Sequence, residues 1–518
     1  MPMFRSFVPE KIRPWIYLCM AIFFQLSGCI YPAAIEEMMG EYSIMREDVT
    51  MCNFVTLAGM AITFPVLFRT KFRFTNKTLL TMSACGIIIC NIASMYITCL
   101  PLLWIICLID GYFKLQGTFE CISNIQLWFT PTRDFTAFFP ILNVIIISCI
   151  SISNWITSMI TYYYHWSYMN YFTIGIMLIV LLVVSSLTKH FRIMKKLPLY
   201  GIDWLGASLW SVLSIEIMFL FNYGEFYDWW NSNVICVLTY IIIITALVAV
   251  GRMISIRHPY IEPEMWKYRN YGKLLLLITI TEALLATEYV LEEIFHKSVL
   301  HYNIVTVAPI YLWTVVGVII GCSFAYIWMK VMHYNFVKLI TVGIAVLALY
   351  MTIYYFLISS QINIEKFYIL AVIRGCSYGI LSSTFFTCLE ELMTFRHFFQ
   401  GLSIFNMLHM FIGGVIGSAL YSFGVRYFMA DNFERYSNNI NHSFAFFYKD
   451  GNQQFMNRFM TDMQMISLKS IYGFVAYACI ALFLVLLLHN TPIRNTLKLI
   501  PSWQKVGKSI KRFVKQQK

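Results

Sequence analysis

Three ionisable residues interrupt one apolar stretch, residues 100–130, that is long enough to cross a bilayer as a helix. They are Asp110, Lys114 and Glu120. An ionisable side chain at membrane depth costs roughly 2.5–3.5 kcal/mol even on the lenient insertion scale, so it faces a protein interior or a water-filled cavity. Asp110 and Lys114 are four residues apart and share a helix face, with the acid on the favourable N-terminal side. Glu120 needs another partner or a proton.

Further ionisable residues lie in later apolar spans. Glu282 and Glu288 share one such span, and Arg374 lies in another. A carboxylic acid in a partly desolvated cavity can bind and release a proton near neutral pH. Because Glu120, Glu282 and Glu288 are expected at different depths, they are the candidate proton-coupling residues.

Asp110, Lys114 and Arg374 are the candidate charge partners in such a cavity. Each of these residues also has a simpler interpretation. Asp110 and Lys114 can form a purely structural ion pair, and Arg374 is either a counter-ion to one of the acids or a contact for an anion. Glu288 can extend toward the membrane surface instead of facing a cavity.

Glu216 and His409 are secondary candidates, and Gly413 and Gly417 are expected helix-packing residues. Glu216 lies within a span and either takes part in function or hydrogen-bonds a neighbouring helix. His409 is the one histidine expected deep in a span, where a packed, hydrogen-bonded role is favoured over a proton relay. Gly413 and Gly417 are four residues apart and form a small-residue face that permits close helix packing.

The sequence holds no pattern for catalysis or metal binding. It contains no nucleotide-binding P-loop, no zinc-ligand spacing and no loop arrangement of a nucleophile with its base. The 14 cysteines lie in or beside apolar spans and imply no disulfide framework. We therefore expect a protein that is not an enzyme and uses neither a cofactor nor a metal.

Composition identifies the broad class. The 518 residues are 59% hydrophobic and only 12% charged, whereas soluble domains are about 25% charged. A window of about 20 residues predicts an all-α membrane protein with about fourteen spans. The expected spans are 15–35, 49–68, 79–98, 100–129, 135–164, 168–188, 203–222, 233–252, 274–291, 303–328, 338–358, 367–389, 401–427 and 468–488.

The net charge of +12 is explained by membrane topology. Most Lys and Arg residues fall in alternate short loops, and the positive-inside rule makes those loops cytoplasmic. Both termini are then cytoplasmic, the protein is a multi-pass protein of the plasma (inner) membrane, and nucleic acid is not a partner. The intervening loops are acidic and aromatic.

Two proline-containing basic segments divide the chain into parts. The expected parts are an N-terminal six-helix bundle (1–188), two inserted helices with flanking cytoplasmic loops (189–273), a C-terminal six-helix bundle (274–490) with an external loop at 429–466, and a basic cytoplasmic tail (491–518). This 6 + 2 + 6 division is notable because six-span halves build one large superfamily of carriers.

Several motifs carry a family resemblance. They are Asp203-Trp204-x-Gly206, Asn222-Tyr223-Gly224-Glu225 with Asp228-Trp229, Arg374-Gly375-x-x-x-Gly379, and Gln400-Gly401 followed by Asn406, His409, Gly413 and Gly417. Together they resemble the major facilitator superfamily, specifically its fourteen-span drug:proton antiporters of the EmrB/QacA type. The chain departs from that family where Phe113 replaces the arginine of an RxxQG motif and where SCISISNWIT at 148–157 replaces a Gly-Pro kink.

The resemblance implies a major-facilitator fold in which spans 1, 4, 9 and 12 line a central cavity. It also implies proton-coupled efflux of hydrophobic or amphipathic small molecules by alternating access, with a periplasmic adaptor and an outer-membrane channel as further partners. Two alternatives stay open. One is an importer or facilitator of an anionic metabolite, with Lys114 and Arg374 as anion contacts. The other is a membrane-embedded transferase or a scaffold that transports nothing.

Overall fold

The computed structural model describes residues 3–490, except 28–30, 32–33, 98, 131–133, 192–195, 197–198, 333–334 and 438–451. The expected basic tail at 491–518 lies outside the described residues. Within the described part the chain is helical and contains no β-strand beyond one isolated bridge between Phe4 and Thr188. Thirteen helices there are long and apolar enough to cross a membrane. The expected all-α, multi-pass membrane fold is confirmed.

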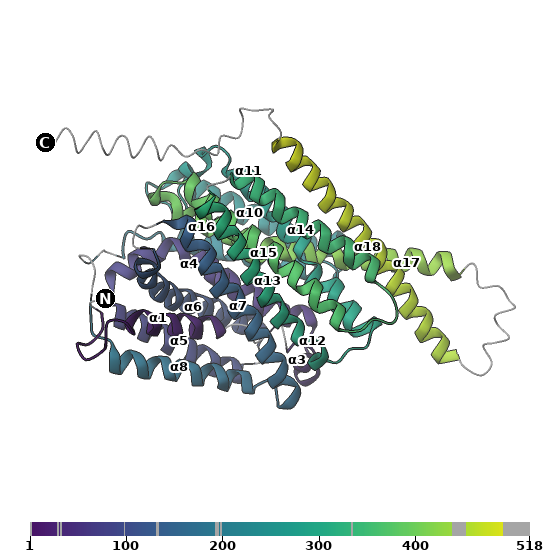
Figure 1. Ribbon diagram of the computed structural model, residues 1–518, viewed down its shortest axis with the longest axis horizontal. Coiled ribbons are helices and arrows are strands. Elements are labelled where there is room, and N and C mark those ends of the chain that lie inside the picture. Colours follow the sequence, from purple (N-terminus) through teal and green to yellow (C-terminus); the bar gives the residue numbers. More distant parts are fainter. Residues whose placement is uncertain are drawn as a thin grey trace.

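The first group of helices packs into one bundle, drawn in purple and blue in Figure 1. It comprises α1 (Arg13–Leu26), α4 (Arg46–Arg73), α5 (Asn76–Tyr96), α6 (Leu100–Phe129), α7 (Phe135–Tyr163) and α8 (Tyr168–Leu187), with the short α3 (Ile35–Tyr42) before α4. We call this group the N-terminal bundle. The first expected span, 15–35, differs from the structure because α1 ends at Leu26.

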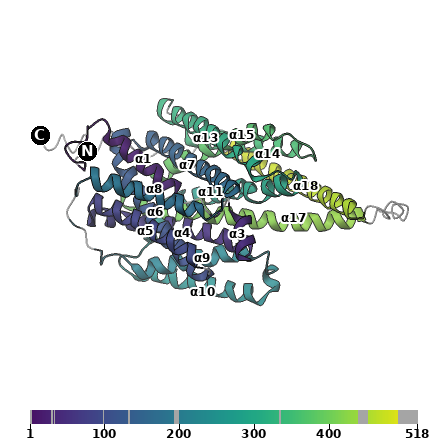
Figure 2. The same ribbon diagram turned by 90° about the horizontal axis from the view of Figure 1, so that it is seen from below.

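The next two helices form a hairpin at the edge of the molecule, visible in Figure 2. They are α9 (Trp204–Tyr223) and α10 (Asn233–Ser255), and α9 packs on α4 and α17. Only 11% of the apolar window of α10 is buried within the protein, so most of this helix faces the membrane.

The remaining helices form a second group, which we call the C-terminal bundle. It comprises α11 (Tyr271–Leu285), α12 (Ile304–Val307), α13 (Pro309–Tyr326), α14 (Phe336–Leu357), α15 (Glu365–Leu392), α16 (Phe395–Met407), α17 (Gly413–Ser437) and α18 (Asn452–Asn490). The two bundles meet where α7 packs on α13 and α15, and where α4 packs on α16.

Two sequence expectations about the C-terminal bundle were wrong. The ninth span does not end at 291, because π-helical turns at Glu288–Glu292 and Phe295–Val299 extend it to Val299. Most of the expected loop at 429–466 is helical, since α17 runs to Ser437 and α18 begins at Asn452. Polar helix that projects beyond the apolar segment has the composition of a loop, so a hydropathy window cannot recognise it.

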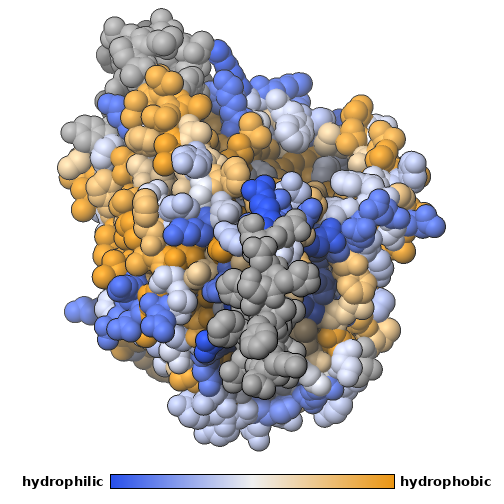
Figure 3. Space-filling model, turned by 90° about the vertical axis from the view of Figure 1, so that its right-hand side faces the viewer, coloured by the Kyte–Doolittle hydropathy of each residue, from blue (hydrophilic) through white to orange (hydrophobic). Residues whose placement is uncertain are grey.

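Charge distinguishes the two ends of the molecule. Helix α4 starts with Glu47 and Asp48 in its first turn and finishes with Lys71 and Arg73 in its last, which also suits the helix dipole. We call the end that carries Glu47 and Asp48 the acidic end, and the opposite end the basic end. Figure 3 views the acidic end, where hydrophilic and hydrophobic residues both reach the surface. The positive-inside rule predicts that the basic end is cytoplasmic.

Glycines bring two helices into backbone contact in each bundle. A Cβ added at Gly111 of α6 would lie 2.1 Å from the carbonyl oxygen of Thr56 in α4. Likewise, a Cβ at Gly317 of α13 would lie 2.2 Å from the carbonyl oxygen of Val372 in α15. Close approach of this kind is a common way to stabilise helix pairs in membranes. It fixes α6 and α15, the helices that carry Asp110, Lys114, Glu120 and Arg374.

Candidate functional site

A cavity of about 410 Å³ lies between the two bundles, toward the acidic end. The N-terminal bundle contributes polar residues of α4 and α7 to its wall, including Asn53, Asn154 and Ser158. The C-terminal bundle contributes the end of the ninth span together with Arg374 and Met410. The cavity is thus formed jointly by both bundles, and changes in their relative position would change its access.

Arg374 is the electrostatic centre of this cavity. Its guanidinium is buried and contacts two carboxylates: Nη1 lies 2.8 Å from Oε2 of Glu292, and Nη2 lies 3.0 Å from Oε1 of Glu288. Nη2 also donates a hydrogen bond of 3.3 Å to Oγ1 of Thr314. Two carboxylates around one guanidinium carry one excess negative charge, which a proton or a cation can compensate.

The two acids differ in their access to water. The Glu292 side chain is 8% exposed and accepts a hydrogen bond from the hydroxyl of Tyr350, whereas the Glu288 side chain is 35% exposed. Glu288 is therefore the acid that water or solute in the cavity can reach. Both lie in the π-helical turn Glu288–Glu292, and such turns occur frequently at functional sites.

Sequence reasoning missed Glu292. The hydropathy window ended the ninth span at 291, which placed Glu292 and Glu293 in a loop. The signal that was available is their spacing: Glu288 and Glu292 are four residues apart and share a face of any helix that continues past 291.

Glu282 lies deeper in the same span and pairs with His409. Nδ1 of the imidazole is 2.7 Å from Oε1 of Glu282, and the side chains are only 6% and 12% exposed for His409 and Glu282. The rings of Phe386 and Phe405 enclose the imidazole. Gly413 makes room for this pair, because a Cβ there would lie 2.6 Å from Cβ of Glu282. Gly417 lets α17 approach α11 in the same way, beside Ala283.

Glu120 lies away from these acids and does not line the cavity. It is almost fully buried, Oε2 is 3.6 Å from Nζ of Lys71, and Oε1 accepts a hydrogen bond of 3.1 Å from Asn124. The partner that the sequence could not identify is thus Lys71, near the end of α4. The structure brings Glu288 and Arg374 together and keeps Glu120 apart from them.

The remaining candidate charges occupy separate places. Asp110 and Lys114 lie on one face of α6, but no direct ion pair or hydrogen bond joins them among the described residues, so the structural ion pair that was one of their two interpretations is not formed in this conformation. Helix periodicity aligns their backbones and does not set the direction of two flexible side chains. Glu216 accepts a hydrogen bond of 2.6 Å from Thr245, which links α9 to α10.

Aromatic rings close the basic end between the bundles. Phe68 of α4 and Phe399 of α16 have ring centroids 4.2 Å apart, and Phe119 of α6 lies 5.8 Å from Phe399. The hydroxyl of Ser403 also donates to the carbonyl oxygen of Ala61 at 2.9 Å. The cavity therefore does not continue to the basic end in this conformation.

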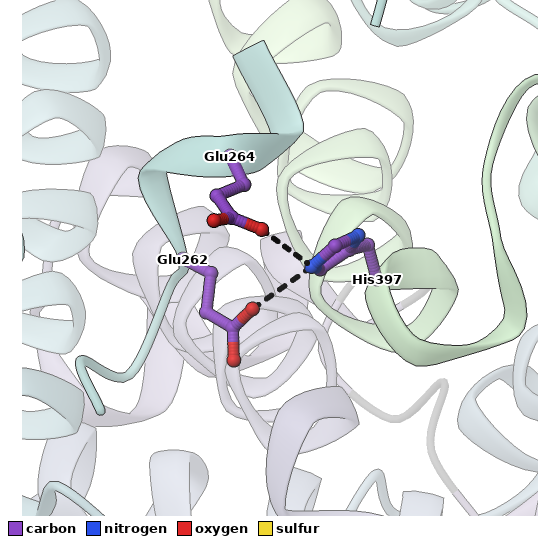
Figure 4. A group of neighbouring side chains, drawn as sticks. All are labelled: Glu262, Glu264 and His397. Atoms are coloured by element: carbon purple, nitrogen blue, oxygen red, sulfur yellow. Dashed lines mark hydrogen bonds and ion pairs between the residues drawn. The ribbon is translucent and has the colours of Figure 1, made fainter. Parts of the chain in front are cut away.

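The segment 260–268, which we call the strap, reinforces this closure. Tyr260 donates a hydrogen bond to the carbonyl oxygen of Ile62 in the N-terminal bundle. Glu262 and Glu264 point toward His397 of α16 (Figure 4), with carboxylate oxygens 2.9 and 3.5 Å from Nε2. Tyr268 contacts Nδ1 of the same imidazole at 2.9 Å. The strap thus joins the two bundles across their boundary.

An ion pair bridges the bundles at the acidic end. Arg46, the first residue of α4, pairs with Glu293 and donates to the carbonyl oxygen of Tyr289 at 3.2 Å. The side chains of Arg46 and Glu293 are 38% and 21% exposed, and exposed pairs contribute little to stability. This ion pair is therefore a weak link between the bundles at the acidic end.

No family model matches this chain, and no curated protein matches it either. Similar solved structures do exist. Tetrameric PepTSo2 has a TM-score of 0.58 at 11% identity, over 93% of this chain and 98% of that chain. A bacterial homologue of the human drug peptide transporters PepT1 and PepT2 has a TM-score of 0.57 at 13% identity, over 93% and 98%.

A mutant of the nucleoside transporter NupG also aligns, with a TM-score of 0.53 at 10% identity over 91% of this chain and 99% of that chain. Identities this low show a common fold alone. The expected assignment to the EmrB/QacA type stays a prediction. The chain has the helical fold of these solved membrane transporters.

Proposed function

We propose that this protein is a secondary active transporter, in which the cavity between the bundles opens alternately to each side of the membrane. The observation that carries the proposal is the group Glu288, Arg374 and Glu292 at the wall of that cavity. Charged groups at membrane depth are usually functional, and they most often mark pathways for ions or solutes. The transporter fold supports the same conclusion.

Exchange of a proton for a cation follows from the charges. With Glu288 and Glu292 both ionised, the group has one excess negative charge, and Glu288 is the accessible member. A proton on Glu288 or a cationic solute beside it would each supply the missing positive charge. Because the proton and the solute each neutralise this charge, binding of one weakens binding of the other. Loading of one is therefore coupled to release of the other, as antiport requires.

The whole cavity lining favours a cationic solute. Six carboxylates lie along it against three Lys or Arg side chains: Glu37, Glu47, Glu225, Glu288, Glu292 and Glu293 against Arg46, Lys297 and Arg374. Such a wall attracts cations and repels anions. Lys114 does not line it, and Arg374 is already neutralised, so neither provides the anion contact that import of an anionic metabolite requires. We therefore favour efflux of an amphipathic cation.

Import of a polar neutral solute is a second candidate. Three asparagines, Asn53, Asn154 and Asn222, lie along the cavity and offer both donors and acceptors. Proteins of the same fold are described as peptide and nucleoside transporters. This candidate needs no excess negative charge, which separates it from the first.

Transport into liposomes tests both candidates. Purified protein is reconstituted, a pH gradient is applied, and movement of tetraphenylphosphonium is compared with that of uridine and dialanine. We expect gradient-driven movement of the cation in the wild type. Glu288→Gln should abolish the response to the gradient while it keeps cation exchange at equal pH, and Glu365→Gln, at the exposed start of α15, should change neither. Gradient-driven cation transport by Glu288→Gln would reject the coupling role.

A further inference from the structure

A groove of about 670 Å³ lies on the outer surface of the C-terminal bundle, apart from the transport cavity. It runs along α14 and α18, which lie side by side (Figure 1). Its wall is apolar except at one end. The lining residues are Trp328, Lys338, Thr341, Val342, Ala345, Val346, Leu349, Phe483 and Leu487.

The sequence of α14 forms the floor of this groove. Val342, Ala345, Val346 and Leu349 follow helical spacing and therefore share one face. The first three are short, so the surface of α14 is low there. Phe483 of α18, a larger side chain, stands beside it and forms a wall. A hollow results although the two helices are in contact along their length.

The position of the groove restricts what can fill it. Both helices are long and apolar enough to span the membrane, and Leu349 and Leu487 are 52% and 41% exposed. The groove therefore opens into the hydrocarbon of the bilayer, where lipid chains are the available molecules. Lys338 and Leu349 are eleven residues apart, about 16 Å along a helix, which is about half of the ~30 Å hydrocarbon thickness. This length matches one leaflet.

The polar end of the groove lies at the basic end of the protein. Lys338 is the exposed third residue of α14, and the hydroxyl of Thr341 already donates to the carbonyl oxygen of Val337 at 2.8 Å. Among the described residues, the lysine is thus the one charge along the lining. A cation at headgroup level above an apolar hollow one leaflet long is complementary to a lipid with a negative headgroup.

We propose that the groove binds an anionic phospholipid of the leaflet at the basic end, with one acyl chain along α14 and the phosphate beside Lys338. The site does not depend on the transport cycle or on the identity of the solute. The acyl chain provides contact with any phospholipid, and Lys338 provides the preference for a net negative charge.

Native mass spectrometry of the purified chain in detergent tests this proposal, with phosphatidylglycerol and phosphatidylcholine as probes. Lys338→Gln should weaken retention of phosphatidylglycerol about fivefold, the effect of one lysine near a charged headgroup, and leave phosphatidylcholine unchanged. The matched control is Lys273→Gln. Lys273 is the exposed third residue of α11 at the same end and lies outside the groove.

Filling the groove gives a second, independent measurement. Ala345→Trp should reduce retention of both lipids, because it occupies the path of the acyl chain. Leu349→Trp, at a half-exposed position, serves the same purpose if Ala345→Trp does not fold. Equal losses for Lys338→Gln and Lys273→Gln, or unchanged retention in the filled variants, would show ordinary boundary lipid and overturn the proposal.

Discussion

The buried guanidinium of Arg374 forms ion pairs with Glu288 and Glu292. Of the two acids, Glu288 is the one exposed to the cavity. Among the described residues, the ion pairs of both acids are made with this one guanidinium, so the three residues act as one electrostatic unit. Sealed carboxylates without a counter-ion are costly in a low-dielectric environment. The stability of the protein and the proposed coupling therefore depend on the same guanidinium.

Arg374→Gln should lower the free energy of unfolding by about 3–5 kcal/mol, because it leaves buried charge unpaired. The double variant Arg374→Gln/Glu292→Gln should recover a large part of that loss, since it removes the more deeply buried charge as well. Thermal melting in detergent measures both. A double variant no more stable than the single one would show that the two residues do not interact as described.

At the scale of single elements, helix contacts decide where the embedded side chains lie. Helix α17 reaches α11 through Gly413 and Gly417, and this contact places His409 beside Glu282. The preceding π-helical turn, Leu408–Ile412, adjusts the register between α16 and α17. A small change in this contact should therefore alter both packing and the His409–Glu282 pair.

Two adjacent glycines offer a direct comparison for that contact. Gly413→Ala should destabilise the protein by about 1–3 kcal/mol, as overpacking does, because its Cβ would lie 2.6 Å from Cβ of Glu282. Gly414→Ala should be neutral or stabilising, because the nearest atom to its Cβ is 3.9 Å away and alanine favours a helix. Melting temperatures in detergent distinguish the two, and equal effects would contradict the described packing.

Asp203 lies at the start of α9 and pairs with Arg252 of α10, so it links the two helices of the inserted hairpin. Nη2 of Arg252 lies 2.6 Å from Oδ1 of Asp203. Burial alone would raise its pKa, but hydrogen bonds from Arg252 and from the backbone N–H of Gly206 hold the pKa below the ordinary value. Its stabilising contribution is therefore complete above the unfolded-state value of about 3.9 and is lost as pH falls through the folded-state pKa.

Asp203→Asn should melt at a lower temperature than the wild type at pH 7, and the difference should shrink as the pH falls below about 4. The control is Asp431→Asn, which removes a partly exposed pair with Arg435 and should have little effect. If the difference in melting temperature between Asp203→Asn and the wild type stayed constant with pH, the ionised carboxylate would be ruled out as its source.

For the whole molecule, the two ends of the boundary between the bundles are closed by different means. Among the described residues, aromatic packing, the strap and the Asp134–Lys330 ion pair link the bundles at the basic end, whereas the partly exposed Arg46–Glu293 pair links them at the acidic end. A transporter in this conformation would load or release solute at the acidic end. Opening the basic end requires the strap to separate from Ile62 or from His397.

Tyr260→Phe should loosen the strap, because it removes the hydrogen bond to Ile62 and keeps the ring. Hydrogen exchange should then increase in residues 62–68 and 260–268. Tyr302→Phe is the matched control, since its hydroxyl also donates to a backbone carbonyl, that of Ile362, but within one bundle. The strap would be excluded as a link between the bundles by either of two results. One is faster hydrogen exchange at the basic end in Tyr302→Phe, and the other is unchanged exchange there in Tyr260→Phe.

The sequence by itself determined the membrane class, the approximate spans and the residues that carry charge within them. Those conclusions depend on local composition, because the bilayer acts on each segment of about 20 residues separately. The apolar run in α10 and the embedded Arg374 are recognisable without any knowledge of their neighbours. Fold class followed from the number of spans and the motifs that resemble a known family.

Only the tertiary structure decided which charges meet. Glu120 pairs with Lys71, Glu282 with His409, and Arg374 with Glu292, a residue that hydropathy had placed in a loop. These pairs join helices far apart in the chain, and periodicity specifies the face of a helix but not the helix that packs against it. Packing of the two bundles makes that choice, and π-helical turns shift the faces that regular spacing would predict.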